Sequence, residues 1–449
     1  MVQVLIPSGA LGLDYDRAAL ARGIAMRPDI IAIDGGSTDS GPSYLGRGVS
    51  KYSRASTKLE WQGLMEARAE AGVPLVIGTA GTCGADSAVD WLYEITQEIA
   101  SELGQSVRVA RLYSNQAPEA VVAARADGRL TPLAAAPEIS DEILRDCTNI
   151  VALAGAEQIA AALDTGADIV IAGRTTDTGI IAALPLARGC HSGAAWHGAK
   201  IGECGAICTT RPSSGVIMVR FDQTGFSIQP LAEGVEATPH TVSAHMLYEN
   251  ADPFILHEPG GHLDVTEAAY RAEPEGVRVE GSVWVPSERY TVKLEGARRA
   301  GYQAVLLAVL RERRYVENAS AWAEDIIAQC RAKAEARLGI TDFDIEIRLI
   351  GQNAVLGTLE TRGEGAPEVG ALGIVTANSP EATAEIAKML NPYLLHHGLT
   401  PDEPMPTFAF PFSPAEIQRG EIFEFCLNHV LELSDPMEAF RLEVSELHG

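Results

Sequence analysis

The segment DIIAIDGGSTDSG, residues 29–41, decides the fold, because four apolar residues run directly into a loop of glycines, hydroxyls and aspartates. A short, continuous apolar run indicates a strand that is buried on both faces, as in a parallel sheet. The same arrangement recurs after Val2–Ile6, Pro74–Ile77 and Asp168–Ala172, and helical patterns such as Ser56–Ala71 and Asp86–Leu103 lie between the runs. This βαβ repetition predicts right-handed crossovers and a doubly wound, mostly parallel, Rossmann-like sheet. We therefore expect an α/β chain whose residues 1–199 form a ligand-binding domain.

The pattern changes after residue 199. Apolar runs at Val216–Phe221 and Phe226–Pro230 indicate a hairpin, and a helix is expected over Thr241–Asn250. Further strands are expected in four places and long helices in two: Val277–Val285, Tyr290–Leu294, Gln303–Leu310 and Ile422–Glu432, with helices over Asn318–Leu338 and Glu381–His397. Residues 200–449 are thus predicted to form an α+β domain that completes a cleft.

Composition excludes several classes of protein. The 449 residues are 46% hydrophobic and 21% charged, and 60 acidic against 35 basic residues give a net charge of −25. A field of that sign repels nucleic acid and anionic lipid, so neither is expected as a partner. No basic leader and no membrane-length apolar run occurs, and only seven cysteines are present, which predicts a cytoplasmic protein. Its size favours an enzyme that assembles as a homo-oligomer.

The loops after the apolar runs predict a site for a small anionic substrate. In an open parallel sheet, ligands bind beyond the carboxyl ends of the strands, where glycines expose backbone N–H groups. The candidate substrate-binding residues are Asp34, Ser37, Thr38, Asp39, Gly81, Thr82, Arg174, Thr175 and Asp177. Each loop alone is equally explained by turn geometry and helix capping. The dinucleotide and P-loop motifs are missing, so NAD, flavin and ATP are not expected.

Three further segments supply candidate catalytic residues. WHGAKIGECG, residues 196–205, places His197, Lys200 and Glu203 at helical spacing, which a plain ion pair also explains. HEPGGHLD, residues 257–264, offers Glu258 and His262 as acid–base groups or as ligands of a divalent metal, unless it is only a polar loop. YTVKLEG, residues 290–296, contains Lys293, which could bind a carboxylate or act as a base. The alternative is that this strand face is simply solvated.

Taken together, these motifs resemble the acyclic terpene utilisation (AtuA-like) family. The similarity is carried by DGGSTDSGP (34–42), GTAGTCGA (78–85), GRTTD (173–177), WHGAKIGECG, SAHMLYEN (243–250), HEPGG, YTVKLEG, FPFSPAEI (410–417) and LNH (427–429). It spans residues 4–429, although Thr175 stands where a small apolar residue is expected. The resemblance implies catabolism of organic acids, with branched terpenoid acids handled as CoA thioesters. It also implies that a small companion protein acts with the chain, and it transfers no catalytic assignment.

The leading hypothesis is a lyase of the hydratase or dehydratase type that acts on a small organic acid or its CoA thioester. Anion-binding loops and several acid–base groups favour it, and no redox or nucleotide motif competes. One alternative is an amide, lactone or thioester hydrolase with Cys83 or Cys204 as nucleophile, since Cys83 precedes a predicted helix. The other is a metabolite-binding subunit that is active only with its small partner.

Overall fold

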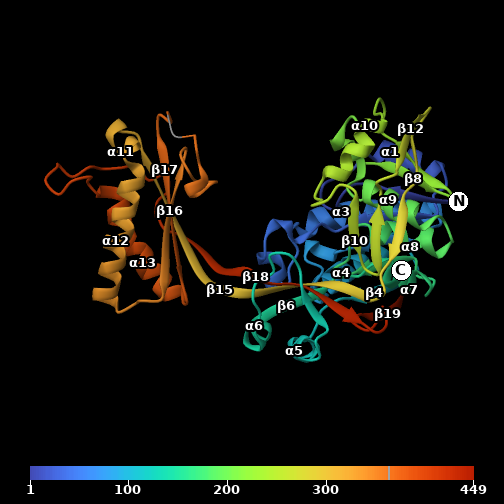
Figure 1. Ribbon diagram of the computed structural model, residues 1–449, viewed down its shortest axis with the longest axis horizontal. Coiled ribbons are helices and arrows are strands. Elements are labelled where there is room, and N and C mark those ends of the chain that lie inside the picture. Colours follow the sequence, from blue (N-terminus) through green and yellow to red (C-terminus); the bar gives the residue numbers. More distant parts are fainter. Residues whose placement is uncertain (363–364) are drawn as a thin grey trace. The chain divides into compact units, whose positions relative to one another are not determined.

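The structure is a computed structural model that describes residues 1–362 and 365–449. The chain divides into two compact units (Figure 1): unit 1 holds Met1–Arg298 and Glu424–Gly449, and unit 2 holds Arg299–Phe423. The expected boundary after residue 199 falls inside unit 1. It differs because the hairpin that follows residue 199 continues the first sheet instead of starting a new one.

Unit 1 is built on a ten-stranded sheet with a parallel centre. The central order is β1-β2-β3-β7-β4, with β1 Val2–Ile6, β2 Ile30–Asp34, β3 Leu75–Gly78, β7 Ile169–Ala172 and β4 Val107–Tyr113. Antiparallel strands extend both edges: β8 Ile217–Phe221, β9 Gly225–Pro230, β13 Gly276–Glu280 and β12 Ala269–Glu273 beside β1, and β19 Arg441–Leu447 beside β4. The expected α/β class with a large sheet is confirmed, and later segments of the chain supply the antiparallel edges.

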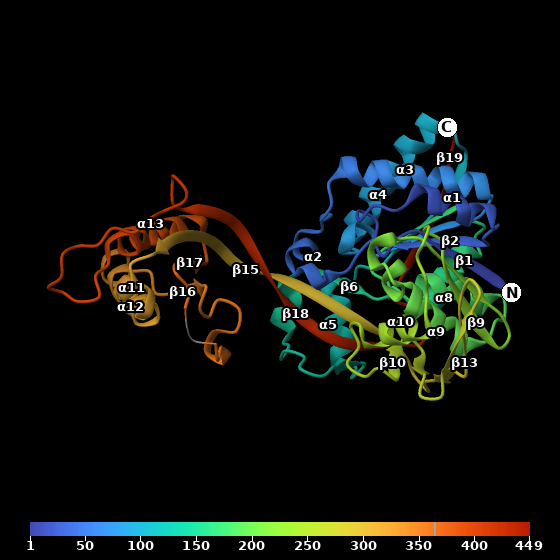
Figure 2. The same ribbon diagram turned by 90° about the horizontal axis from the view of Figure 1, so that it is seen from above.

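Both faces of this sheet are covered by helices. Along β2, Ile30 and Ala32 belong to one hydrophobic core, whereas Ile31 and Ile33 belong to another, as strand alternation requires. The first core contains α7 Ala156–Leu163, α8 Gly179–Ala187 and α9 Ser192–Gly202, and the second contains α1 Arg17–Ala25, α3 Arg54–Ala71 and α4 Asp86–Leu103. Figure 2 shows these two helical layers on opposite sides of β1 and β2.

The connections after β3 and β7 leave the sheet in opposite directions. These two strands are parallel neighbours, yet β3 leads to α4 on one face and β7 leads to α8 on the other. Such a topological switch point opens a crevice beyond the carboxyl ends of the strands, which is where α/β folds bind their ligands.

Unit 1 also contains shorter elements and parts of two long strands. Its shorter elements are α2 Ser43–Arg47, α5 Pro118–Ala126, β5 Leu130–Pro132, α6 Asp141–Asp146, β6 Cys147–Ala152, α10 Pro239–Ala244, β10 Ile255–Glu258, β11 Gly261–Asp264 and β14 Val283–Pro286. Single-turn 3₁₀ helices are η1 Thr38–Ser40, η2 Ala80–Thr82, η3 Gly205–Cys208, η4 Pro212–Ser214 and η5 His245–Leu247. Two long strands, β15 Tyr290–Leu310 and β18 Ile417–Leu433, contribute residues to both units. In unit 1, β15 pairs with β6, so that Glu295 lies opposite Val151.

Unit 2 is a smaller α+β layer. Strands β16 Phe343–Ile350 and β17 Val369–Ala377 pair with each other, and residues 302–310 of β15 pair with β17. Helices α12 Ala319–Leu338 and α13 Pro380–His396 pack along this sheet (Figure 1), while α11 Arg313–Glu317 and η6 Gly357–Leu359 are short. Within the described residues, no helix has the length and apolar content needed to cross a bilayer.

Four expected elements differ from the structure. The strand expected over Val277–Val285 breaks into β13 and β14, because Gly281 adopts a φ of 89° that turns the chain between two sheets. The helix expected over Thr241–Asn250 ends at Ala244 and tightens into η5. The two strands expected within 290–310 form the single strand β15.

The switch point depends on a glycine that no larger residue can replace. Gly84 has a φ of 64°, and an added Cβ would lie 2.4 Å from the backbone nitrogen of Arg174. Gly104 has the same φ of 64° but open space around it, so Gly104→Ala is a matched control for backbone strain alone. We expect Gly104→Ala to lower the free energy of unfolding by about 1 kcal/mol and Gly84→Ala by about 3 kcal/mol. Urea unfolding followed by circular dichroism measures both; equal losses would show that the contact with Arg174 is unimportant.

Candidate functional site

Three loops meet at the carboxyl edge of the parallel strands. Asp34 ends β2, Thr79 follows β3, and Arg174 follows β7. The backbone N–H of Gly35 donates to the Gly78 carbonyl at 2.8 Å, and that of Thr79 donates to the Gly173 carbonyl at 2.8 Å. A Cβ on Gly35 would lie 2.3 Å from the Thr79 carbonyl oxygen. The glycines of these loops therefore allow the backbones to approach closely, and this close packing fixes the side chains around them.

Arg174 is the central cation of this edge. Its Nε donates to Glu295 Oε2 at 3.0 Å, and a second nitrogen, Nη1, donates to Thr79 Oγ1 at 3.2 Å. Glu295 also accepts hydrogen bonds from Lys293 Nζ and Thr38 Oγ1, each at 3.0 Å. Burial alone would raise the pKa of Glu295, but the charges of Arg174 and then Lys293 lower it to about 2. Glu295 is therefore an ionised anchor that holds the guanidinium in place.

Two aspartates flank Arg174. Asp34 Oδ2 accepts a hydrogen bond from the Gly36 N–H at 2.7 Å, while Oδ1 is buried and has no partner. Burial, followed by the charge of Asp177, holds the pKa of Asp34 well above its usual range. Burial also raises the pKa of Asp177 to about 6, although Arg174 and Lys200 lower it. Carboxyl groups with pKa values raised in this way are more typical of functional sites than of an ordinary surface.

The expected convergence of His197, Lys200 and Glu203 is partial. Lys200 forms an ion pair with Glu203, the residue that caps α9. Burial raises the pKa of Glu203 to about 8, while the Lys200 ammonium opposes the shift. His197 lies apart from this pair, with Nδ1 2.7 Å from Ser282 Oγ and Nε2 3.1 Å from Tyr270 OH. Burial lowers the pKa of His197 to about 3, and neither ring nitrogen is left for a substrate.

The segment that contains Glu258 and His262 forms the β10–β11 hairpin. Here Glu258 Oε1 accepts a hydrogen bond from Thr178 Oγ1, and Oε2 is buried without a partner. Burial raises the pKa of Glu258 to about 7, although the Thr178 hydroxyl lowers it. His257 and His262 instead face each other across the hairpin, with ring centroids 5.6 Å apart. The hairpin therefore separates the carboxyl group from the two imidazoles.

His245 joins the site, although the sequence analysis did not select it. It is 3% exposed, and neither ring nitrogen meets hydrogen-bond geometry with a partner. Burial, and then the charge of Lys200, lower the pKa of His245 to about 4, against a small opposing effect of the Lys200 carbonyl. One ligand atom each of His245, Glu203 and Cys204 lie within 4.8 Å of one another. In the sequence, His245 is marked only by the motif SAHMLYEN. A helix is expected over this motif, and that helix gives no reason to place His245 beside Glu203.

The remaining loop residues are engaged within their own turns. Ser37 Oγ accepts from the Asp39 N–H at 3.3 Å, Thr82 Oγ1 donates to the Gly81 carbonyl at 2.5 Å, and Thr175 lies fully buried against Thr79. Asp39 is exposed. Most of these groups shape the loops, and whether any contacts a substrate remains a prediction.

The two candidate thiol nucleophiles sit in different surroundings. Cys83 is fully buried, whereas Cys204 is half-buried. Burial raises the pKa of both thiols, and the charge of Glu203 raises that of Cys204 further. Neither environment supplies the depressed pKa that an activated thiolate requires.

The charges around the switch point do not balance. Carboxyl groups come from Asp34, Asp177, Glu203, Glu258 and Glu295, and the cations are Arg174, Lys200 and Lys293. The groups act on one another, since Asp177 raises the pKa of Asp34, Glu203 and Glu258 alike. Buried polar atoms without a partner occur on Asp34, Glu258 and His245. Because leaving such groups unpaired is costly, this cluster has the character of a ligand site rather than of a folding core.

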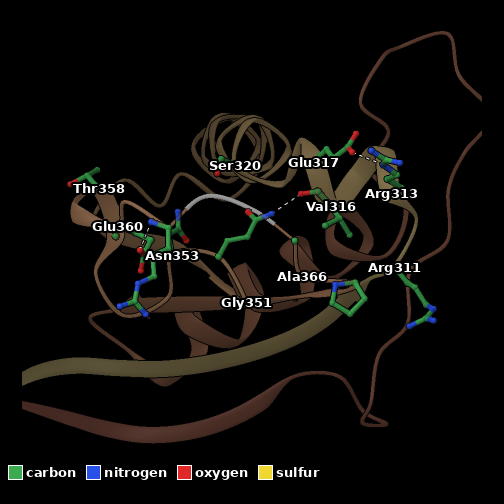
Figure 3. Close-up of a pocket in the computed structure, with 15 residues that line it drawn as sticks. Arg311, Arg313, Val316, Glu317, Ser320, Gly351, Asn353, Thr358, Glu360 and Ala366 are labelled. Carbon is green, nitrogen blue, oxygen red and sulfur yellow. Dashed lines mark hydrogen bonds and ion pairs between the residues drawn. The ribbon is translucent and has the colours of Figure 1, made fainter.

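A cavity of about 970 Å³ lies in unit 2 (Figure 3), but it offers fewer groups suited to binding or catalysis than the switch point does. Arg313 pairs with Glu317, Arg311 pairs with Glu368, and these side chains are 52% exposed or more. None of the cavity's lining residues carries a buried side-chain polar atom without a partner. Exposed ion pairs of this kind are solvated and contribute little, so unit 1 is the better candidate for the site.

The Arg174–Glu295 pair makes a testable contribution to stability. Glu295→Gln would leave a buried guanidinium without its counter-ion, so we expect a loss of about 3 kcal/mol at pH 7. Because the pKa of Glu295 is lowered to about 2, its contribution is complete above the usual carboxyl pKa and disappears as the pH falls toward 2. The difference between wild type and variant should shrink over that window.

Urea unfolding at several pH values checks this expectation. Glu432→Gln is a matched control, because Glu432 pairs with Arg289 at 3.0 Å and the two side chains are 37% and 74% exposed. We expect it to cost less than about 0.5 kcal/mol. A loss for Glu295→Gln that does not depend on pH would show that the ion pair is not its source.

Comparisons with known proteins identify one family. No curated protein and no solved structure matches the chain. The model of the family described as "Acyclic terpene utilisation family protein AtuA" matches residues 52–400. That range contains Thr79, Arg174, the acidic cluster around Lys200, and Glu295. The chain therefore belongs to the acyclic terpene utilisation family AtuA.

Proposed function

We propose that this chain is a catabolic lyase of the hydratase or dehydratase type, acting on a hydroxy or unsaturated organic acid or its CoA thioester. Membership of the AtuA family points to acyclic terpene utilisation as the pathway. Addition or removal of water next to a carbonyl is a reaction open to unsaturated and hydroxylated acids, and general acid–base groups perform it. The observation that carries the proposal is the state of Glu258.

Glu258 combines the geometry and the acidity of a general acid–base residue. Thr178 fixes one carboxyl oxygen, and the other oxygen is buried and unpartnered. A pKa raised to about 7 lets the group hold or release a proton near neutral pH. A catalytic acid–base group functions best when its pKa lies near the working pH.

The surroundings of Glu258 set this pKa. Burial raises the pKa most, whereas the Thr178 and Thr176 hydroxyls and the ammonium of Lys200 favour the ionised form. Asp177, by contrast, disfavours the ionised form. The charge of Glu258 in turn raises the pKa of Glu203 and of Tyr290. Glu258 is therefore coupled to both the cation and the carboxyl groups of the cluster.

Two carboxyl groups with different pKa values can divide the reaction between them. In the dehydration direction, ionised Asp177 takes the α-proton, while neutral Glu258 gives its proton to the leaving hydroxyl. The C–O bond breaks, the C=C bond forms, and water departs. Hydration is the reverse, in which ionised Glu258 takes a proton from the attacking water. Arg174 and Lys200 supply positive charge for the carboxylate or thioester oxygen.

A variant of Glu258 tests the proposal. The screen uses branched unsaturated and hydroxylated acids, free and as CoA thioesters, and follows the loss or gain of the conjugated double bond by absorbance. We expect Glu258→Gln to lower turnover by about 100- to 1,000-fold, because the amide cannot transfer the proton. The neighbouring His257→Gln is the matched control and should leave turnover unchanged, since His257 is exposed on the same strand.

The pH profile adds a test that a merely structural role would not meet. Dehydration needs neutral Glu258 with ionised Asp177, and hydration needs the reverse, so in both directions the two carboxyl groups share one proton. The kcat of each direction should therefore fall as the pH rises through about 7 and fall again as it drops through about 6. Tight binding of an acid or thioester with no turnover in either direction would instead favour the metabolite-binding subunit.

A further inference from the structure

We propose that Glu203, Cys204 and His245 hold a divalent cation of the zinc type, with an open position for water or substrate. The role of this ion in catalysis rests on the proposed function. Its binding does not, because binding is measured without turnover. Glu203 and Cys204 are consecutive residues after α9, and His245 opens η5, some forty positions along the chain. The fold brings one ligand atom of each to within 4.8 Å of the others.

His245 is the feature that calls for a ligand. Its imidazole is 97% buried, and both nitrogens lack a hydrogen-bond partner within the described residues. A buried imidazole is normally satisfied by at least one partner, as His197 is by Ser282 and Tyr270. Coordination of a cation would satisfy one nitrogen. The Lys200 carbonyl, which lies close to the ring, is the kind of second partner that metal-bound histidines use.

The donor set selects the class of metal. Thiolate, imidazole and carboxylate together favour zinc and similar first-row cations, whereas Mg²⁺ and Ca²⁺ take oxygen ligands. Tetrahedral bonds of about 2.0–2.3 Å place ligand atoms about 3.5 Å apart, so the side chains need to close by only about 1 Å. Three protein ligands with a fourth position open is the arrangement of catalytic rather than structural zinc.

The backbone holds these ligands in place before any ion binds. A Cβ added to Gly9 would lie 3.0 Å from the Cys204 carbonyl oxygen, so the loop after β1 packs directly against the ligand segment. His245 stacks on Tyr248, with ring centroids 5.6 Å apart and planes inclined by 26°. Rigid support of this kind reduces the ordering that binding would otherwise require.

Access and charge agree with this assignment. His245 lines a cavity of about 440 Å³ together with Ile207, Thr241 and Tyr248, which gives an ion or substrate a route to the ring. Beside the ligands, the charge of Asp177 acts on both Glu203 and Cys204, and the ammonium of Lys200 acts on all three ligands and pairs with Glu203, a contact that the cation would replace. A divalent cation would offset this acidic excess, so that an anionic substrate is attracted rather than repelled. When bound, such an ion polarises a carbonyl oxygen or lowers the pKa of water.

Metal binding to the untagged full-length chain tests the proposal. The protein is treated with chelator, incubated with Zn²⁺ or Co²⁺, desalted, and analysed for metal by mass spectrometry. We expect one tightly held equivalent in the wild type. Cys204→Ser and His245→Ala should each weaken binding by at least about 100-fold, because each removes a direct ligand. The cobalt form should show a thiolate-to-metal charge-transfer band that Cys204→Ser removes.

Two controls exclude other sites. Cys208→Ser alters a buried thiol that contacts the Gly205 carbonyl and lies outside the ligand cluster, so it should retain the metal and the band. The double variant His257→Ala/His262→Ala removes the paired imidazoles of the hairpin and should also retain both. Failure of the wild type to keep an equivalent, a cobalt spectrum without the thiolate band, or undiminished binding by His245→Ala would each overturn the proposal. If the chain retains the metal but turns over no acid or thioester, the metal site is supported and only the proposed lyase activity is contradicted.

Discussion

The guanidinium of Arg174 joins parts of the fold that are far apart in the sequence. Its hydrogen bonds reach Glu295 on β15 and Thr79 after β3. The backbone N–H of Arg174 also donates to Ser114 Oγ at 2.8 Å. Glu295 binds Thr38 and Lys293 in turn. Because the ion pair is buried, removing Glu295 would take the nearest carboxylate from the guanidinium, and removing Arg174 would leave Glu295 with Lys293 as its only directly paired cation in the described residues. Asp177 lies 4.0 Å from the Arg174 guanidinium, whose charge opposes the rise in pKa of both Asp34 and Asp177.

The anchor explains why similar carboxyl groups differ so widely in acidity. Glu295 lies against two cations and has a pKa lowered to about 2, whereas Glu258 has hydroxyl partners, a more distant Lys200, and a pKa raised to about 7. Lys200 is itself committed to Glu203. Burial acts on both Glu295 and Glu258, and the two cations that Glu295 holds directly account for the difference between them. Glu203 holds one cation, Lys200, and burial with the nearby charge of Asp177 still raises its pKa to about 8. The site thereby keeps one fixed anion and several groups that can exchange protons.

Much of the fold could be predicted from the sequence, because burial on both faces of a strand leaves a continuous apolar run. The expected helix Asp86–Leu103 matches α4, and the apolar run Val2–Ile6 matches β1. Loop positions at the carboxyl edge could be predicted for the same reason. Antiparallel additions such as β19 carry no comparable signal, since their side chains alternate between core and solvent.

The site was harder to predict, because its residues come together only through pairing that sequence spacing does not encode. Strand alternation places Lys293 and Glu295 on one face, which could hold a catalytic lysine or be a solvated surface. In the structure β15 pairs with β6, and Glu295 binds Arg174. His197 and Lys200 share helical spacing, yet the helix α9 is buried on every side. One side chain therefore reaches Tyr270 and the other reaches Glu203. Spacing indicates a shared helix face only when part of the helix is exposed, and a fully buried helix allows each polar residue to find a separate partner.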